Sequence, residues 1–265
     1  MTRGSFVFND FSSLGAGLRV GGVASYAASG REVQAYYVPG RIGAVYPAPD
    51  FSQIPNEIRE YTVGLYRRAD PNEAITNVMA LLRDAFLNVD GYAILTDSYE
   101  PQFYRRAFFT GDFVPTRKGA GQNFEIPLRF SCDPRRYIAG DYDFTIYGSS
   151  GTVTYDTPSQ VGDFYIKDPS KPLIKVNTGG DAATITFTDV ATGIQIGQLK
   201  LAGYGEEAEF YFDAETLLAW FEGGESANYL IEDVVGEIRL GPGSTRISFN
   251  DPLISLKFTP RWWVR

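Results

Sequence analysis

The stretch Asp70–Gly91, DPNEAITNVMALLRDAFLNVDG, is the one segment of this sequence with a clear helical pattern. Asp70 suits the N-cap position, Pro71 suits the first helical position, and Glu73 completes an Asp-x-x-Glu capping box. Apolar residues then recur at three- and four-residue spacing, namely Ile75, Val78, Met79, Leu82 and Phe86. This spacing predicts an amphipathic helix over residues 71–87, ended by the polar, glycine-containing cluster that follows.

Two stretches, one on each side of the helix, alternate between apolar and polar residues. Before the helix, Tyr61, Val63 and Leu65 are separated by Glu60, Thr62 and Gly64. After it, residues 123–132 place an apolar side chain at every second position: Phe124, Ile126, Leu128, Phe130 and Cys132. Successive side chains of a strand point to opposite faces, so both stretches are typical of strands with one buried face. We therefore predict that the apolar stripe of the helix packs on one face of a largely antiparallel sheet.

Composition favours a mainly β protein. The 265 residues include 28 Gly and 15 Pro, and 15% are aromatic, a combination typical of short strands and turns. After residue 140, short apolar segments recur at intervals of roughly eight to twelve residues, as in a β-sandwich. These segments are Phe144–Tyr147, Leu173–Val176, Thr184–Phe187, Gln198–Ala202, Glu209–Phe212, Gly236–Leu240, Arg246–Phe249 and Leu253–Phe258. We predict two domains, an α+β domain over residues 1–140 and a β-sandwich over residues 141–265.

Local chemistry gives further expectations about single elements. The Pro-Gly pair inside Val38–Arg41 is the central pair of a type II turn. Asn177–Asp181 is the clearest hairpin turn, and Tyr104–Phe113 is expected to form one long strand. Thr216–Phe221 fits either a short helix or a strand.

Missing residue types exclude several classes of function. The chain has no histidine, which excludes a Ser-His-Asp triad and any histidine-ligated zinc or iron. Cys132 is the only cysteine, so neither an intrachain disulfide nor a thiolate metal cluster can form. Its place among apolar strand positions predicts a small buried hydrophobe. The net charge of −8 argues against binding of nucleic acid through phosphate neutralisation.

No motif points to catalysis or to a cofactor. The acidic pairs occur in predicted turns, where carboxylates are usually solvated: Glu206-Glu207, Asp141 with Asp143, and Glu232-Asp233. The glycine-rich pieces lack the spacing of a phosphate or dinucleotide loop. We therefore predict no catalytic residue, no metal site and no cofactor. The first residues lack a secretory signal and no apolar run suffices for a membrane span, so we expect a soluble protein made in the cytoplasm.

The end of the chain, residues 259–265, carries two adjacent tryptophans between arginines. Neighbouring side chains on a strand point to opposite faces. Either one tryptophan is exposed, or both close the core of the second domain. An exposed tryptophan beside an arginine would suit a protein or glycan contact, which makes Arg261, Trp262 and Trp263 candidate contact residues. Tyr165, Trp220 and Tyr229 carry the same two alternatives.

Several motifs, in order along nearly the whole chain, resemble the distal tail protein family of long-tailed bacteriophages. The resemblance begins with residues 6–9 and 13–20 and continues through 92–107, 240–247 and 260–263. One of its turns consists of Val38, Pro39, Gly40, Arg41 and Gly43. The strand that closes the first domain carries the last group, Phe130, Cys132, Pro134 and Tyr137.

This resemblance implies a non-enzymatic structural protein of the virion. Members of the family form a ring, usually a hexamer, at the tip of the tail tube. The N-terminal domain makes a belt around the channel through which DNA leaves without specific binding, and the helix belongs to this domain. The C-terminal domain is a sandwich similar to galectins and carbohydrate-binding modules. Implied partners are the tail tube protein, the hub or tail-associated fibre protein, and receptor-binding proteins, with no membrane insertion.

Two alternatives come from other classes of protein. A carbohydrate-binding, lectin-like module for host recognition would use the aromatic residues of the second domain. A glycoside hydrolase would need two carboxylates that face each other across a cleft. Glycan binding that is lost on replacing an exposed Trp would identify the first, and one carboxylate essential for hydrolysis would identify the second.

Overall fold

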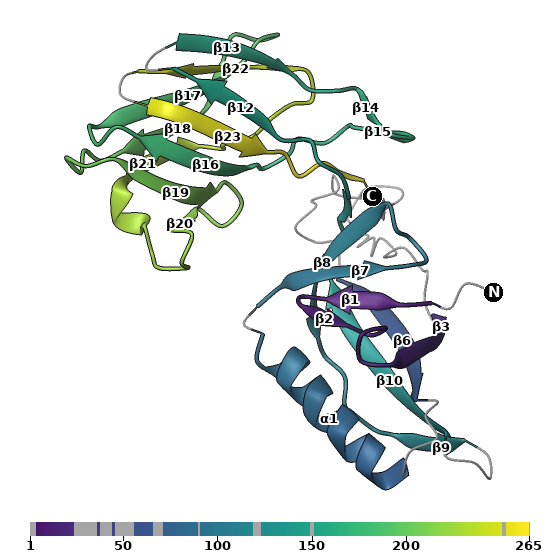
Figure 1. The fold of residues 1–265 in the computed structure, drawn as a ribbon. Helices are drawn as coiled ribbons and strands as arrows, with labels where there is room; N and C mark the ends of the chain where they lie inside the picture. Colours follow the sequence, from purple (N-terminus) through teal and green to yellow (C-terminus); the bar gives the residue numbers. More distant parts are fainter. Residues whose placement is uncertain are drawn as a thin grey trace. The chain divides into compact units, whose positions relative to one another are not determined.

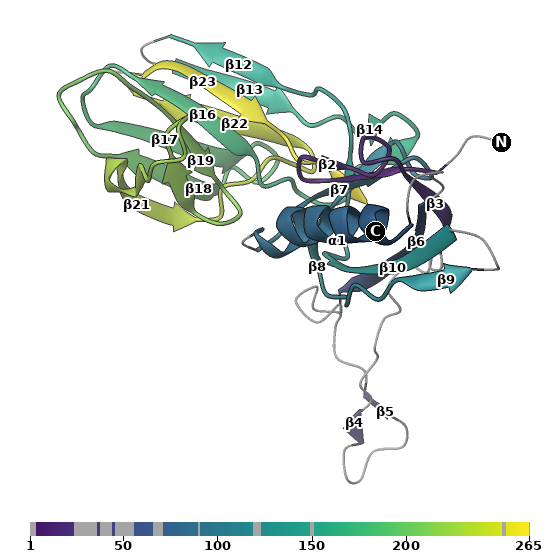
Figure 2. The same cartoon turned by 60° about the horizontal axis from the view of Figure 1, so that its bottom comes forward.

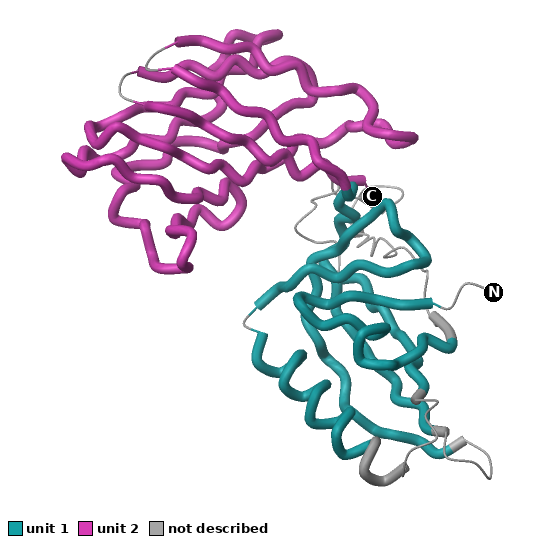
Figure 3. The backbone as a smooth tube through the Cα atoms, in the orientation of Figure 1, with its two compact units in different colours: residues 1–139, 265 teal, residues 140–264 magenta. Residues whose placement is uncertain are grey.

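The computed structural model describes residues 4–23, 36–37, 44–45, 56–65, 71–89, 91–118, 123–148, 151–250 and 253–264. The chain forms two compact units, which are residues 1–139 with Arg265 and residues 140–264 (Figure 3). Strands dominate both units, and the α-helix of the described residues, α1 (Pro71–Leu87), belongs to the first unit (Figure 1). The expectation of a mainly β protein with one helix in its first part is confirmed.

Unit 1 is built on one antiparallel sheet with the strand order β2-β1-β7-β8-β10-β6-β3. Its strands are β1 (Phe6–Phe8), β2 (Phe11–Ser12), β3 (Leu18–Val23), β6 (Glu57–Leu65), β7 (Ala93–Asp97), β8 (Phe103–Phe109) and β10 (Asn123–Cys132). The short strands β9 (Thr116–Lys118) and β11 (Arg136–Ile138) pair with β10 and β8. A separate pair joins β4 (Tyr36–Tyr37) to β5 (Ala44–Val45).

The helix packs on this sheet through the predicted stripe. Val78, Leu82 and Phe86 are buried in one core with the apolar positions of β6 and β10. The ring of Phe86 lies 5.4 Å from that of Phe130 on β10, measured between centroids. Figure 2 shows α1 lying along the sheet. Asp70 and the side chain of Glu73 lie outside the described residues, so the capping box stays a prediction.

The strand predicted over Tyr104–Phe113 is too long, because β8 ends at Phe109. The chain passes β10 closely here: a Cβ added to Gly111 would lie 3.1 Å from Cβ of Arg129. The ring of Phe113 stacks on that of Phe109, with centroids 4.7 Å apart. The apolar residue at position 113 therefore reflects core packing beyond the end of the strand.

Unit 2 consists of two five-stranded antiparallel sheets, β12-β23-β16-β19-β20 and β13-β22-β17-β18-β21. The strands of the first sheet are β12 (Phe144–Tyr147), β16 (Leu173–Thr178), β19 (Ala208–Asp213), β20 (Leu218–Trp220) and β23 (Leu253–Thr259). Those of the second sheet are β13 (Gly151–Asp156), β17 (Ala183–Asp189), β18 (Gln195–Leu201), β21 (Ile231–Gly236) and β22 (Ser244–Phe249). The same unit contains the pair β14 (Gln160–Val161) and β15 (Phe164–Tyr165), the 3₁₀ turn η2 (Asn228–Leu230) and β24 (Trp263–Val264).

The two sheets of unit 2 share one apolar interior. Along β17 the side chains of Ile185 and Phe187 are buried and those of Thr184 and Thr186 are not, which is the alternation of a strand with one covered face. Phe187 contacts Phe258 of the other sheet edge to face, with ring centroids 6.2 Å apart. The segment whose structure was left open, Thr216–Phe221, contains the strand β20.

Two sequence-based expectations for this unit are wrong. Asn177–Asp181 is no hairpin turn, because β16 before it and β17 after it belong to different sheets. The chain passes from one sheet to the other here, and this path requires a glycine at position 180: its φ is +100°, and a Cβ there would lie 2.7 Å from the backbone nitrogen of Glu206. The strand expected over Gly236–Leu240 lies earlier, as β21, and ends at Gly236 with a φ of +70°. The strands β13, β14 and β15 were not predicted.

Candidate functional site

A network of charged side chains lies inside unit 1, on the sheet face that also carries the apolar core. Arg105 of β8 forms ion pairs with Glu57 of β6 and, at 2.8 Å, with Glu100 of the β7–β8 loop. Arg59 of β6 is paired with the same Glu100. The side chains of Arg59, Glu57 and Arg105 are almost completely removed from solvent, and Glu100 is 19% exposed. Glu100 therefore joins β6 to β8 from the surface side of the network.

A second polar contact lies beside these ion pairs. The hydroxyl of Tyr61 donates to Oδ2 of Asp97 over 2.6 Å, while Oδ1 of Asp97 accepts from the backbone N–H groups of Tyr99 and Glu100. Burial, reinforced by the carboxylate of Asp97, raises the pKa of Tyr61 far above its ordinary value. The hydroxyl thus stays protonated and fixes the loop that presents Glu100.

Sequence reasoning missed this network, although the strand period contains a signal for it. Glu57 and Arg59 occupy the same parity as the buried Tyr61 and Val63 on β6. Arg105 shares the parity of Phe103 and Ala107 on β8. A charged residue at an inward position must be paired, so three such residues on two strands predict an internal ion-pair cluster.

The opposite face of the same sheet exposes large apolar side chains. Val7, Ile94, Tyr92 and Phe108 are 40%, 55%, 42% and 36% exposed. They come from the neighbouring strands β1, β7 and β8 and the residue before β7. The rings of Tyr92 and Phe108 meet edge to face with centroids 5.2 Å apart, and the guanidinium of Arg106 lies 5.7 Å from the centroid of Tyr92. We call these four residues the outer patch.

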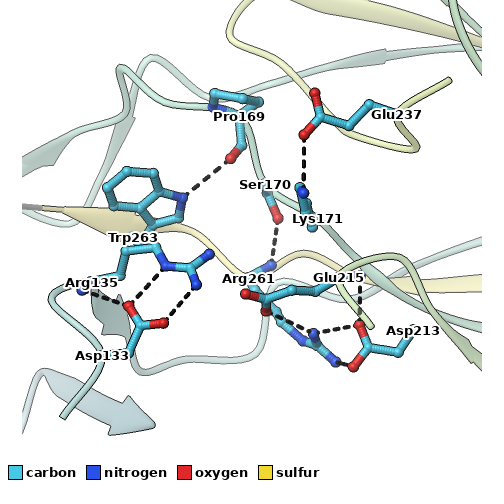
Figure 4. Close-up of polar contacts among 10 residues, drawn as sticks. All are labelled: Asp133, Arg135, Pro169, Ser170, Lys171, Asp213, Glu215, Glu237, Arg261 and Trp263. Carbon is cyan, nitrogen blue, oxygen red and sulfur yellow. Dashed lines mark hydrogen bonds and ion pairs between the residues drawn. The ribbon is translucent and has the colours of Figure 1, made fainter. Parts of the chain in front are cut away.

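The end of the chain is held in unit 2 by polar contacts (Figure 4). The guanidinium of Arg261 donates to both carboxylate oxygens of Asp213, over 2.8 and 3.0 Å, and its backbone N–H donates to Oγ of Ser170. Burial alone would raise the pKa of Asp213, but the hydrogen bonds and charge of Arg261 outweigh it and hold that pKa below its ordinary value. The indole N–H of Trp263 donates to the carbonyl of Pro169.

The structure places the sequence-predicted residues in different surroundings. Trp262 is 1% exposed and belongs to the core, which leaves no ring face for a ligand, whereas Trp263 and Arg261 are half-buried. Tyr165 and Tyr229 are exposed and Trp220 is half-buried.

Most of the family-motif residues that the structure describes are buried. Phe130, Cys132 and Tyr137 are buried, and Pro134 is half-buried. Burial also raises the pKa of the Cys132 thiol to about 12, as expected for an inert side chain. The turn residues Val38, Pro39, Gly40, Arg41 and Gly43 lie outside the described residues, between the paired strands β4 and β5.

Neither a metal-binding cluster nor a membrane-spanning helix is found in the part of the chain that the structure describes. No group of three or more Cys, Asp or Glu side chains there is placed to hold an ion. No helix within the same ranges is long and apolar enough to cross a bilayer.

Comparison with known proteins identifies the fold. No protein-family model and no curated protein sequence matches the chain. Solved structures do match it, along both units. Dit of phage SPP1, described as a paradigm of the hub adsorption apparatus in phages that infect Gram-positive bacteria, aligns over 96% of this chain and 97% of its own. The TM-score is 0.62 at 14% sequence identity.

The chain has the fold of phage Dit proteins. A chain of the phage P2 baseplate in its activated conformation with calcium agrees, with a TM-score of 0.58 at 10% identity. That alignment covers 95% of this chain and 99% of the baseplate chain. The strontium form of the same baseplate gives 0.56 at 10% identity, over 94% and 98% of the two chains. The Dit-like fold thus includes both units, and none of the three neighbours is described as an enzyme.

Proposed function

We propose that this protein is a structural component of a phage tail tip, a ring that joins the tail tube to the hub or baseplate. The observation that carries the proposal is the match of both units, nearly end to end, to hub and baseplate chains. A virion location, at the tail tip, follows from the same role. Unit 1 would form the ring around the channel for DNA, and the net charge of −8 suits a pore that DNA passes without binding.

The outer patch supports the assignment of the ring to unit 1. Four large apolar side chains gathered on one sheet face are unusual for a monomer and typical of a protein contact. The internal ion pairs support the same role, because they tie β6 to β8 and keep the sheet rigid beneath the patch.

Unit 2 would then be the outward domain, a sandwich of the galectin or carbohydrate-binding-module kind that receives the hub, fibre or receptor-binding proteins. Its two facing five-stranded sheets are consistent with that architecture. The lectin-like alternative is favoured by one observation: Tyr211 of β19 and Trp220 of β20 lie side by side on the outer face of the first sheet. A hydrolase has no such support among the described residues.

The mass of the assembled protein tests the ring. Six copies of the 29.3 kDa chain would weigh about 176 kDa, and closed symmetry would limit the assembly to one such species. Mass photometry of the intact chain should show a single species with this mass, or with the mass of a closed ring of another copy number. Residues 1–140 should assemble or aggregate, and residues 141–265 should be monomeric. A monomeric intact chain at micromolar concentration would refute the proposal.

A matched pair of variants locates the contact. Ile94 of the outer patch and Ile194 of unit 2 are 55% and 63% exposed. Ile94→Asp should dissociate the ring because it buries a charge in the interface, whereas Ile194→Asp should leave its mass unchanged. Dissociation by Ile194→Asp alone would assign the ring to unit 2.

A further inference from the structure

The outer face of the sheet β12-β23-β16-β19-β20 carries a row of aromatic and charged side chains on three neighbouring strands. Lys175 of β16 lies opposite Tyr211 of β19, and Tyr211 lies opposite Trp220 of β20. Phe212 and Ala219, at the alternate positions, are buried, so Tyr211 and Trp220 point outward. Both rings are half-buried and lie within reach of solvent.

The two rings form a continuous aromatic surface at the edge of the sheet. Their planes differ by 19° and their centroids lie 6.1 Å apart. On the other side of Tyr211, the ammonium of Lys175 lies 5.4 Å from the ring centroid. Leu218, two positions before Trp220 and on the same face, is 51% exposed. Apolar surface therefore continues along β20.

Groups that can donate and accept hydrogen bonds border the rings. Nζ of Lys175 lies 2.6 Å from Oε1 of Glu209, whose side chain is 48% exposed. Glu209 is on the same face as Tyr211, two residues earlier on β19. The hydrogen bond to Glu209 raises the pKa of Lys175, and the charge of Glu222 acts on Lys175 as well. On the neighbouring strand β23, Lys257 lies opposite Lys175 and pairs with Asp143 over 2.6 Å. Each of these two cations thus has a carboxylate partner.

The outer face of the second sheet carries a different row of side chains. There, Thr152, Ser248, Thr186 and Gln198 follow one another across four strands. They bond to each other, Thr152 to Ser248 over 3.1 Å and Gln198 to Thr186 over 3.2 Å. None of these four side chains is aromatic. The rings of Tyr211 and Trp220 are therefore not a general feature of the outer faces.

We propose that Trp220 and Tyr211, bordered by Lys175 and Glu209, form a binding platform for neutral pyranose sugars. A pyranose has an apolar C–H face that stacks on the electron-rich face of an aromatic ring, and a rim of hydroxyls that both donate and accept. Trp220 offers the ring, the Lys175 ammonium donates, and the Glu209 carboxylate accepts. Both lysines near the rings are already paired with carboxylates, so no unpaired positive charge favours phosphorylated or otherwise anionic glycans. The site is a face of a sheet and not a pocket, so it suits sugar units inside an extended chain.

This proposal does not depend on the ring, and its test is separate. The full chain would be applied to a microarray of bacterial polysaccharides and titrated with soluble hexasaccharides of glucose and of N-acetylglucosamine. We expect binding to neutral glycans. Trp220→Thr should weaken it about tenfold or more, the effect of removing an aromatic anchor. Trp220→Phe should largely restore it, and Tyr165→Thr, at an exposed tyrosine elsewhere in unit 2, should change nothing.

A measurement on the unaltered protein covers the case in which Trp220→Thr does not fold. The chain has three tryptophans, and the indole of Trp262 is buried in the core. In an indole N–H spectrum, a bound sugar should move the signal of Trp220 and leave that of Trp262 in place. The proposal is overturned if no neutral glycan binds, if Trp220→Thr folds and binds normally, or if binding leaves the Trp220 signal unmoved. If the chain does not form a ring, the mass measurement will show it, and the glycan-binding experiments will not be affected.

Discussion

Replacing Glu57 by Gln tests whether the internal ion pairs hold unit 1 together. The substitution keeps the shape of the side chain and removes its charge, so Arg105 loses one of its two carboxylate partners. Both side chains of the Glu57–Arg105 pair are 5% exposed, and breaking such a pair typically costs about 3–5 kcal/mol because a buried charge is left behind. Glu100 remains 2.8 Å from Arg105. We therefore expect Glu57→Gln to lower the unfolding free energy by about 3 kcal/mol, the lower end of that range.

The control is on the same strand. Glu60 of β6 pairs with Arg129 over 3.5 Å, and the two side chains are 45% and 55% exposed. Water screens this pair, so Glu60→Gln should cost less than about 1 kcal/mol. The two variants carry the same chemical change, three residues apart, and differ in burial. Their difference isolates the effect of the buried network.

The two units can be followed separately during unfolding in urea. The far-UV circular dichroism of α1 reports unit 1, whereas all three tryptophans, at positions 220, 262 and 263, lie in unit 2. Glu57→Gln should shift the helix signal and leave the fluorescence transition in place, at one fixed protein concentration. The reasoning would be refuted if both variants lost the same unfolding free energy, or if only the fluorescence transition shifted.

Three further outcomes are expected. In α1, Leu82→Ala should cost about 2–5 kcal/mol and Leu81→Ala less than about 1 kcal/mol in chemical denaturation, because Leu82 is fully buried and Leu81 is 46% exposed; equal costs would mean that the stripe is misassigned. The pKa of Asp213 is lowered in the fold, so its pairing with Arg261 stabilises unit 2 above the ordinary pKa of aspartate, and this stabilisation is lost as pH falls below about 4. Asp213→Asn should therefore make the stability of unit 2, followed by fluorescence, depend less on pH over that range. An unchanged pH dependence would contradict the assignment. The Cys132 thiol should not react with a maleimide at neutral pH until the protein unfolds, and rapid labelling of the native state would show that it is accessible.

Periodicity in the sequence predicted the elements of unit 1 that bury one clear face. The alternation over residues 123–132 became β10, and the stripe from Val78 to Phe86 became the buried side of α1. Both patterns repeat several times within one element, so a single exception does not hide them. The strand predicted over Tyr104–Phe113 extended beyond the end of β8, because Phe113 packs against the core and does not pair in the sheet.

The periodicity of the sequence does not show which strands pair with each other. The turn residues at Asn177–Asp181 are equally compatible with a hairpin and with a crossing between sheets, and only the long-range partners decide: β16 pairs with β19 and β23, and β17 with β18 and β22. Strand β13 was missed for a related reason. Its side chains are mostly exposed, so the apolar alternation that marks a strand is weak there.

The residues assigned to function are those that break the pattern of their own strand. Glu57 and Arg59 are charged at inward positions of β6, where the fold alone would place apolar side chains. Ile94 and Phe108 are apolar at outward positions of unit 1, and Trp220 is aromatic at an outward position of unit 2. Folding alone does not require these choices, since a sheet is stable with apolar residues inside and polar residues outside. Such departures are expected where a surface or a network serves another purpose. We propose that the inward charges stabilise the sheet, that the outward apolar residues of unit 1 contact a neighbouring copy, and that the outward rings of unit 2 bind a ligand. Glu57→Gln, Ile94→Asp and Trp220→Thr should therefore separate stability, assembly and binding.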